Sequence, residues 1–249
     1  MLVAMMAVSL LVASGVALAV TKIGTEGSDT LRGTNGGDNL LGRGGNDVLF
    51  GRGGSDNLLG EEGKDWVLGG NEEANQGGDK NLLGGPGNDG VEGGLGSDTV
   101  LGGSGNDFVF GDKGSDTLVA GGDGRDIVDG GPGSDRMLGG GGGDLVVDGN
   151  INEAARGDVL LGGDGDDIII ADHVPAVKDF VWCGDGFDRV LADRKDVVAD
   201  DCEKVLVLRG SVEEVQEQED AFFESLPPAS IRMIEFFDTF NEQLAPFPL

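Results

Sequence analysis

Hydrophobic residues recur at nine-residue intervals through most of this chain, and glycine and polar residues separate them. The clearest stretch is residues 84–119, which read GGPGNDGVE, GGLGSDTVL, GGSGNDFVF and GDKGSDTLV in four consecutive blocks. Each block has glycine at its first and fourth places, aspartate at its sixth and valine or leucine at its eighth. Glycine permits tight turns, and aliphatic residues with variable neighbours are typical of strands. Each block therefore predicts a turn followed by a very short strand.

The strict period predicts that one structural unit stacks on itself. Two blocks are expected to make one revolution, so residues 18 apart should lie one above the other: Asp89 on Asp107, Asp98 on Asp116 and Val91 on Val109. Strands stacked at about 4.8 Å bring like-charged carboxylates together, and such neighbours repel by roughly 1 to 3 kcal/mol per pair. A cation between successive turns would remove this repulsion.

The residue types in the blocks favour Ca²⁺ as that cation. Carboxylate oxygens and the carbonyls of glycine turns form a flexible, oxygen-only ligand set, which suits calcium better than magnesium with its tighter octahedron. No histidine or cysteine falls within the repeats, which argues against zinc or copper. The candidate side-chain ligands are the sixth-place aspartates: Asp29, Asp38, Asp47, Asp56, Asp65, Asp89, Asp98, Asp107, Asp116, Asp126, Asp135, Asp144 and Asp167.

The blocks match the pattern Gly-Gly-x-Gly-x-Asp-x-aliphatic-x, so the chain resembles the haemolysin-type (RTX) calcium-binding repeat family. The resemblance implies an all-β fold, a right-handed parallel β-roll solenoid with Ca²⁺ bound in the turns between successive rungs. It also implies that the sixth-place aspartate supplies the side-chain ligand and that turn carbonyls supply the rest. The candidate backbone ligands are the fourth-place glycines Gly45, Gly54, Gly87, Gly96, Gly105, Gly114 and Gly133.

Four segments are expected along the chain. Residues 1–19 are apolar and end in a small-x-small pattern, which predicts a signal peptide, with an uncleaved anchor as the alternative. Either would place the repeats outside the cytoplasm. Residues 20–170 carry the β-roll, and residues 171–208, where the glycine pattern fades, are expected to cap the solenoid. Residues 209–249 predict an amphipathic helical tail, with a capping box from Ser211 and a second helix after Pro228.

The block at residues 69–83 is longer than nine residues and places Asn81 where the aliphatic residue should be. Either Leu82 enters the core through a one-residue bulge, or the rung bows out as a loop. Asp79 is consequently a doubtful ligand.

The block at residues 148–161 is also lengthened, and Arg156 replaces its fourth-place glycine. A surface loop is expected there, with a weakened or empty metal site at Asp158. Insertions in stacked repeats map to loops, so these two blocks are candidates for recognition, unless they are tolerated insertions without a role.

Cys183 and Cys202 are the only cysteines, and in a secreted chain they predict a disulfide. Two free thiols or a redox pair are the alternative. In the chain-entropy model, closing a loop of about 20 residues should stabilise the cap by roughly 3 kcal/mol.

The ninth places of alternate blocks form an aliphatic ladder that is expected to point away from the interior, because strand side chains alternate. Exposed ladders of this size usually meet a partner. The tail helices are therefore expected to pack on the roll or on a second copy of it, and a homo-oligomer or a cell-surface partner is a further expectation. Alternatively, the ladder reflects β-propensity alone. Its members are Leu41, Leu59, Leu83, Leu101, Val119, Leu138 and Leu161.

Composition excludes several functions. The chain has 49 glycines among 249 residues, and 46 acidic residues against 17 basic ones give a net charge of -29. Nucleic-acid binding is disfavoured, because it depends on Lys and Arg neutralising phosphates. The single histidine, His173, lacks the context of a zinc protease, and identical repeated carboxylates lack the two unlike environments of a catalytic pair. No enzyme is expected.

The expected function is therefore extracellular calcium binding that drives folding. The alternative is a surface or matrix interaction protein in which calcium is only structural.

Overall fold

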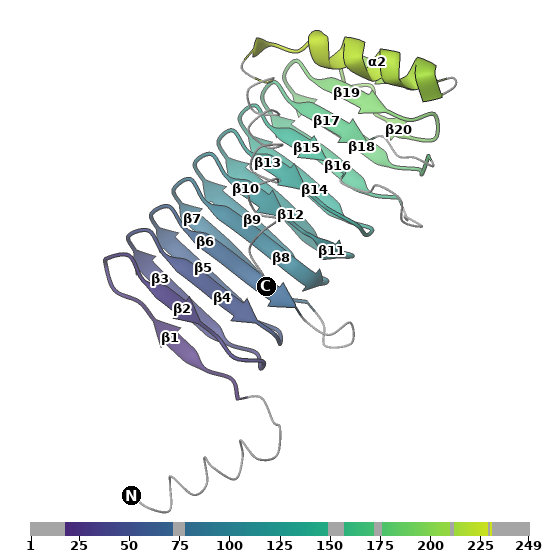
Figure 1. Ribbon diagram of the computed structural model, residues 1–249. Helices are drawn as coiled ribbons and strands as arrows, with labels where there is room; N and C mark the ends of the chain where they lie inside the picture. Colours follow the sequence, from purple (N-terminus) through teal and green to yellow (C-terminus); the bar gives the residue numbers. More distant parts are fainter. Residues whose placement is uncertain are drawn as a thin grey trace, which may run out of the picture.

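The computed structural model describes residues 18–71, 78–148, 157–171, 176–209, 212–228 and 230. The chain forms a parallel β-solenoid in which successive strands alternate between two sheets (Figure 1). Strands one revolution apart pair in parallel, as in the register of Val91 with Val109. Each revolution of two blocks thus adds one strand to each sheet, as the nine-residue period predicts.

The two sheets run the length of the described chain. The ten-stranded sheet has the order β1 (Thr21–Ile23), β3 (Asn39–Gly44), β5 (Asn57–Glu62), β7 (Asn81–Pro86), β9 (Thr99–Ser104), β12 (Leu118–Asp123), β14 (Arg136–Gly141), β16 (Val159–Asp164), β18 (Phe180–Asp185) and β20 (Val197–Val198). The eleven-stranded sheet has the order β2 (Thr30–Arg32), β4 (Val48–Arg52), β6 (Trp66–Asn71), β8 (Gly90–Gly96), β10 (Phe108–Phe110), β13 (Ile127–Asp129), β15 (Leu145–Val147), β17 (Ile168–Ala171), β19 (Arg189–Ala192) and β21 (Lys204–Val207), and β11 (Lys113–Gly114) pairs with β8 off this path.

The core between the sheets is a narrow stack of aliphatic side chains, mostly from the eighth places. Burial of each such side chain contributes about 1.5 to 3 kcal/mol, which is the main apolar stabilisation that so glycine-rich a chain can obtain. The stack contains Leu40, Leu49, Leu58, Val67, Leu82, Val91, Val100, Val109, Val119, Val128, Met137, Val146, Leu160, Ile169, Val181 and Val190.

Leu82 enters this core and is fully buried. It pairs in register with Leu58 of the preceding revolution and with Val100 of the following one. The one-residue bulge is therefore confirmed for the block at 69–83, and the rung continues through β7.

The prediction for Val119 was wrong. Val119 is fully buried and pairs with Val100, whereas Ala120 pairs with Leu101 of the outward ladder. The extra residue of this block therefore lies ahead of β12, at Thr117, and not after the strand. A one-residue shift moves every side chain of a strand to the opposite face, so Ala120 takes the place in the ladder that Val119 was expected to fill.

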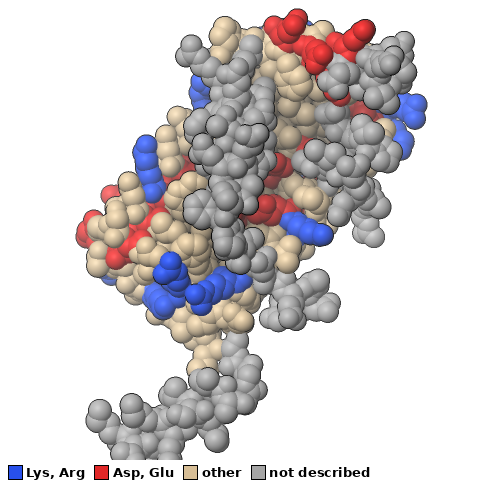
Figure 2. Space-filling model, in the orientation of Figure 1, with Lys and Arg blue, Asp and Glu red and all other residues tan. Residues whose placement is uncertain are grey.

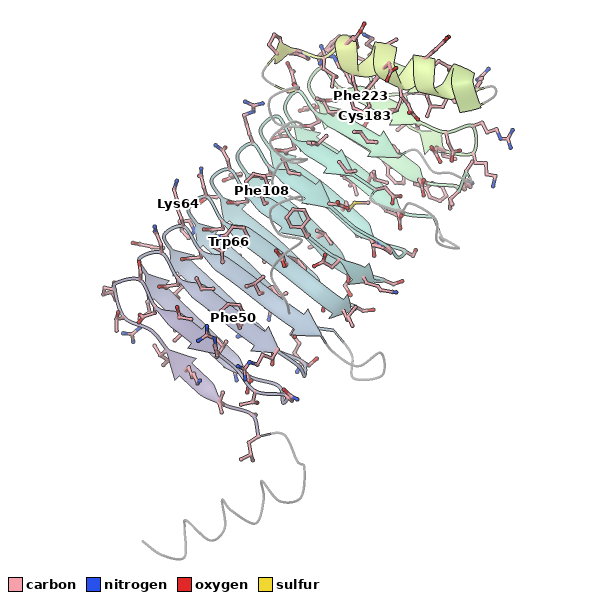
Figure 3. The ribbon with its side chains drawn as sticks, in the orientation of Figure 1. Phe50, Lys64, Trp66, Phe108, Cys183 and Phe223 are labelled. Atoms are coloured by element: carbon pink, nitrogen blue, oxygen red, sulfur yellow. A yellow bond between two sulfur atoms is a disulfide. The ribbon has the colours of Figure 1, made fainter. Side chains whose placement is uncertain are left out.

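Aromatic side chains lie along the eleven-stranded sheet, where Figure 3 shows Phe50, Trp66 and Phe108. Trp66 of β6 lies over Gly90 of β8, where an added Cβ would stand 2.6 Å from the indole ring. Glycine at this position leaves the space that the indole fills.

Four strands, β18 to β21, continue the two sheets beyond the last regular block. Cys183 of β18 is bonded to Cys202, with 5.2 Å between their Cα atoms, so the predicted disulfide is confirmed. Cys183 is itself part of the buried core, and the bond ties the segment before β21 to the ten-stranded sheet.

Helix α2 (Val212–Glu224) follows the strands and lies across the C-terminal end of the solenoid (Figure 1). Phe222 and Leu226 form a hydrophobic cluster with Leu208 and with Leu191 of the eleven-stranded sheet. The helix thus packs on the roll, but the aliphatic ladder belongs to the ten-stranded sheet and is not the surface that it covers.

Several predictions fall outside the described residues. These are residues 1–17 of the predicted signal peptide, His173, the capping residue Ser211, and the second tail helix. Within the described part of the chain, no helix has the length and apolar character needed to cross a bilayer.

Candidate metal sites in the stacked turns

The sixth-place carboxylates stack in two columns, one at each edge of the solenoid. The backbone amide of each aspartate donates to Oδ1 of the aspartate one revolution later; Asp89 to Asp107 and Asp98 to Asp116 are both 2.8 Å, so both predicted stacks are confirmed. The first column is Asp29, Asp47, Asp65, Asp89, Asp107, Asp126, Asp144, Asp167 and Asp188, and ends at Glu203. The second is Asp38, Asp56, Asp79, Asp98, Asp116, Asp135, Asp158, Asp179 and Asp196.

Burial of these columns leaves the second carboxylate oxygen unsatisfied in turn after turn. From Asp38 to Asp188 every column aspartate is at most 4% exposed. A buried charged oxygen without a partner is costly, and natural folds rarely tolerate it without a ligand or ion. Among the described residues, Oδ2 has no hydrogen-bond partner in Asp47, Asp56, Asp65, Asp89, Asp98, Asp107, Asp116, Asp126, Asp135, Asp144, Asp167 and Asp188.

Most of these oxygens face a carbonyl across a small cradle at the first-place glycine. A Cβ added to Gly84 would lie 2.5 Å from Oδ2 of Asp89 and 2.7 Å from the carbonyl oxygen of Gly102. The next turn of the same column repeats the arrangement, because a Cβ on Gly102 would lie 2.6 Å from Oδ2 of Asp107 and 2.5 Å from the carbonyl of Gly121. Two oxygens, one of them charged, thus converge on a space that only glycine keeps open.

The cradle fits a hard cation. Its atoms are a carboxylate oxygen and backbone carbonyl oxygens, with neither nitrogen nor sulfur, which is the ligand set of Ca²⁺. A cation there would satisfy the buried Oδ2 and offset the repulsion along the column. Asp107 and Gly121 illustrate the residues that would hold it: one sixth-place carboxylate and the first-place carbonyl of the next turn.

The first-place carbonyls were not among the predicted ligands, which were fourth-place glycines. Those glycines instead pack backbone against backbone: Gly105, at φ 130°, lies directly on the carbonyl of Gly87, closer than any side chain would permit. Their carbonyls therefore point at the next fourth-place glycine along the stack. The sequence shows that glycine recurs at this position of the repeat, but it does not show in which direction the carbonyl group points.

The first two turns differ from the rest. Thr25 donates its amide and its hydroxyl to Oδ2 of Asp29, at 2.6 and 2.8 Å, and Thr34 does the same to Asp38, at 2.5 and 3.2 Å. The hydrogen bonds from Thr25 hold the pKa of the Asp29 carboxyl below its usual value. In these two turns the chain's own donors satisfy the oxygen that is unsatisfied in later turns.

The structure also brings aspartates into the columns that sequence reasoning doubted or omitted. Asp79 and Asp158, expected to be doubtful or weakened ligands, each accept the amide of the preceding column aspartate, at 2.6 and 2.5 Å. Asp188 lies in a recognisable block that begins at Cys183, and this block could have predicted its place in the column from the sequence. Asp179 has no glycine pattern around it, so only the strand register reveals its place.

Burial raises the pKa of several column carboxyls from 3.8, to about 6 for Asp89 and about 8 for Asp126. The charges of Asp144 and Asp107 add to the rise at Asp126. A carboxyl with a raised pKa keeps a proton in the folded state that the unfolded state has lost. In the absence of a cation, the free energy of unfolding therefore falls as pH rises from about 4 to about 8. A cation would offset this loss by stabilising the charged form.

The columns also change how the net charge of -29 is distributed. Figure 2 shows Lys and Arg over the N-terminal strands and again near the C-terminal strands, with tan and red residues between them. The column carboxylates add little to that surface because they are buried. A substantial part of the negative charge therefore lies inside the turns, where water cannot screen it well.

Comparison with known families agrees with this geometry. A family model described as RTX calcium-binding nonapeptide repeat (4 copies) matches residues 23–58, 44–72, 83–118, 119–146 and 155–172, just over half of the chain. No curated protein matches the chain.

Proposed function

The chain belongs to the RTX calcium-binding nonapeptide repeat family, and on that premise we propose that it binds Ca²⁺ at the stacked turns, outside the cell, and that the ions drive its folding. The repeat fold is of a structural, non-catalytic kind, and we assign the chain no reaction.

One observation carries the proposal: a buried carboxylate oxygen without a hydrogen-bond partner recurs along both columns. In the regular turns this oxygen faces a first-place carbonyl across a cradle of the same shape, as at Gly84 and Gly121. A structural role for the aspartates alone would need only Oδ1, which already accepts the amide of the preceding turn. The second oxygen has no such use in the protein, so a cation is the partner that its chemistry requires.

The proposed role in folding follows from the number of sites. Extracellular calcium modules bind at about 10⁻⁴ to 10⁻³ M, and at about tenfold excess each site adds about 1.4 kcal/mol. On the order of ten sites would together match the whole stability of a typical domain, about 5 to 15 kcal/mol. Without the ions, the carboxylates oppose the fold.

The proposed location rests on two sequence features. The apolar segment at residues 1–19 has the pattern of a secretory leader, and a disulfide between Cys183 and Cys202 persists in oxidising compartments. Millimolar calcium outside the cell would keep sites of this affinity filled. Detection of the mature chain in culture medium, cleaved after Ala19, is the expected result.

The binding proposal is tested by counting ions in matched variants. Asp107→Asn keeps the size of the side chain but removes its charge and replaces one of the two carboxylate oxygens with an NH₂ group, which cannot bind a cation. Asp123→Asn removes one charge from an exposed third-place side chain in the same column region. In equilibrium dialysis at millimolar Ca²⁺, Asp107→Asn should hold fewer ions per chain than the parent, and Asp123→Asn should hold the same number. Equal counts in all three proteins would contradict the assignment.

A second candidate function is a surface or matrix scaffold in which calcium only maintains the roll. The observation in its favour is the half-buried ladder on the ten-stranded sheet, which the register extends to Ile23 and Trp182, 54% and 43% exposed. Contiguous apolar stripes usually meet a partner. Light scattering of the calcium-loaded chain, with and without charged substitutions at Leu59 and Leu101, tests it: an unchanged mass at all concentrations removes self-association.

A further inference from the structure

One turn of the second column departs from the others in a way that adds charge. The block at residues 148–161 has 14 residues in place of nine, and its first place is Asp148 instead of glycine. The backbone nevertheless keeps its register there: the amide of Asp148 donates to the carbonyl of Ile170 at 2.9 Å, as that of Gly111 does to Asp129 at 2.8 Å. Asp148 is therefore a true first-place residue.

A side chain at the first place points into the cradle. In a regular turn an added Cβ would stand between the column carboxylate and the next carbonyl, as Gly121 shows with 2.5 Å to Asp126 and 2.7 Å to Gly139. At Asp148 that direction is taken by a carboxylate. Single oxygens of Asp148, Asp158 and Asp179 lie within 4.8 Å of one another, and the three residues are at most 5% exposed.

A fourth buried carboxylate lies in the preceding turn of the same column. Asp135, one revolution before Asp158, is 4% exposed, and its amide donates to Oδ1 of Asp158 at 2.5 Å. Its Oδ2 has no hydrogen-bond partner among the described residues. Burial raises the pKa of Asp135 to about 7, and Asp148 is the first of the neighbouring charges that add to the rise. Oδ2 of Asp135 lies 3.2 Å from a Cβ added to Gly130. The amide of Gly130 donates to the carbonyl of Val147, so this oxygen lies in the turn that stacks directly on the one beginning at Asp148.

We propose that Asp148, Asp158 and Asp179, together with Asp135, form a calcium site of a different kind from the repeat turns, one built mainly from carboxylates. This inference rests on the proposed function, since it assumes that the roll takes up Ca²⁺. It concerns residues outside the repeat pattern: Asp148 and Asp179 lie beyond the matched segments. The lengthened block, expected to weaken a site, instead supplies an additional ligand.

The charge of the cluster determines how it should behave. Several buried carboxylates this close cannot all be ionised at neutral pH unless a cation joins them. The calcium affinity of protein sites rises with the number of charged ligands, so this site should fill before the regular turns, which offer one carboxylate from each block. The competing arrangement is a set of carboxyls that share protons and bind no ion.

Two matched variants separate these arrangements. Asp148→Asn removes the additional carboxylate at constant size, and Asp164→Asn removes one charge from an exposed side chain of the adjacent β16. Equilibrium dialysis is run at free Ca²⁺ about tenfold below the midpoint for the whole chain. At this concentration the parent and Asp164→Asn should each hold about one ion, and Asp148→Asn should hold none. The affinity of this site for Ca²⁺ should be at least tenfold weaker in Asp148→Asn. Identical binding curves for the parent and Asp148→Asn would overturn the proposal.

Thermal melting makes the test independent of ion counting. In mild acid with EDTA, where the ion-free fold is expected to be most stable, Asp148→Asn should melt at or above the temperature of the parent, because it removes a buried carboxyl from the cluster. The rise in melting temperature on adding Ca²⁺ should be smaller in Asp148→Asn than in the parent. If Ca²⁺ raises the melting temperatures of the parent and of Asp148→Asn by the same amount, the result would support proton sharing and overturn the site. If Asp148→Asn does not fold in calcium, Asp179→Asn should lose the same ion, and a full count of ions in that variant contradicts the proposal.

The same data distinguish this failure from failure of the proposed function. A parent chain that holds no ions at millimolar Ca²⁺ refutes calcium binding altogether. A parent that fills its repeat turns but is indistinguishable from Asp148→Asn at low calcium refutes only the carboxylate site.

Discussion

Substitution of one first-place glycine should separate the ion-binding cradle from the rest of the turn. In the block that begins at Gly139, a Cβ at that residue would lie 2.6 Å from the carbonyl oxygen of Gly162 and 2.7 Å from Oδ2 of Asp144. Gly141, two residues later, offers a matched control: its added Cβ would meet only Asp123, at an ordinary 3.5 Å. Neither glycine has a positive φ, so backbone strain does not distinguish the two substitutions.

The expected cost of Gly139→Ala has two parts. Overpacking of a tight site costs about 1 to 3 kcal/mol whether or not calcium is present. Loss of one ion removes about a further 1.4 kcal/mol at tenfold calcium excess, and this part vanishes in EDTA. Gly141→Ala should be neutral or slightly stabilising, by up to about 1 kcal/mol, because it restricts the unfolded chain.

Urea unfolding, followed by circular dichroism, measures both parts. It is performed on the parent and both variants in Ca²⁺ and in mild acid with EDTA, where the ion-free fold is expected to be most stable. The gain in the free energy of unfolding on adding Ca²⁺ should be smaller in Gly139→Ala than in Gly141→Ala. Equal gains in the two variants would refute the assignment of the cradle as an ion site.

The other predictions concern pH, the core and the disulfide. With EDTA present, the free energy of unfolding should fall as pH rises from about 4 to about 8, because folded carboxyls such as Asp126 have raised pKa values; with Ca²⁺ present, stability should instead rise over this range, and parallel pH profiles in the two conditions would contradict the reasoning. Leu82→Ala should lower the free energy of unfolding by about 2 to 5 kcal/mol, and Leu83→Ala, on the outward face, by much less; similar urea midpoints would show that the register is wrong. The double variant Cys183→Ser, Cys202→Ser should lower the free energy of unfolding by roughly 3 kcal/mol in the chain-entropy model. Amide hydrogen exchange should increase first in β18 to β21, and a uniform increase along the roll would contradict a local effect of the disulfide.

Most of the fold could be predicted because each block encodes its own turn and strand. The spacing of 18 between stacked residues follows from the period alone, and the hydrogen bonds from Asp89 to Asp107 and from Asp98 to Asp116 confirm it. The sequence could not predict which residues of an irregular block point into the core and which point outward. The block before Gly121 has one residue too many, and sequence does not show whether it lies before or after the strand; the structure buries Val119 and turns Ala120 outward.

The stacking of the carboxylates could be predicted from the sequence, whereas the direction of each turn carbonyl could not. An aspartate at the same place in every block predicts a stacked column of carboxylates. The direction of a carbonyl group depends on backbone angles, and glycine permits many of these. The place of Asp148 could not be predicted for another reason. It stands where the repeat has glycine, in a block of irregular length, and only the backbone register with Ile170 shows that it occupies the first place of a turn.

Folding of the ion-free chain is the most direct test of the central claim that a divalent cation completes the buried columns. The mature chain is dialysed exhaustively against EDTA at pH 7.5, and its far-ultraviolet circular dichroism is then followed during titration with Ca²⁺, with Mg²⁺ titrated in parallel. The expected result is a spectrum without β-structure in EDTA that changes cooperatively to that of the β-roll at millimolar Ca²⁺ and not at equal Mg²⁺. A chain that keeps its β spectrum and its melting temperature in EDTA, unchanged by added Ca²⁺, would contradict the claim.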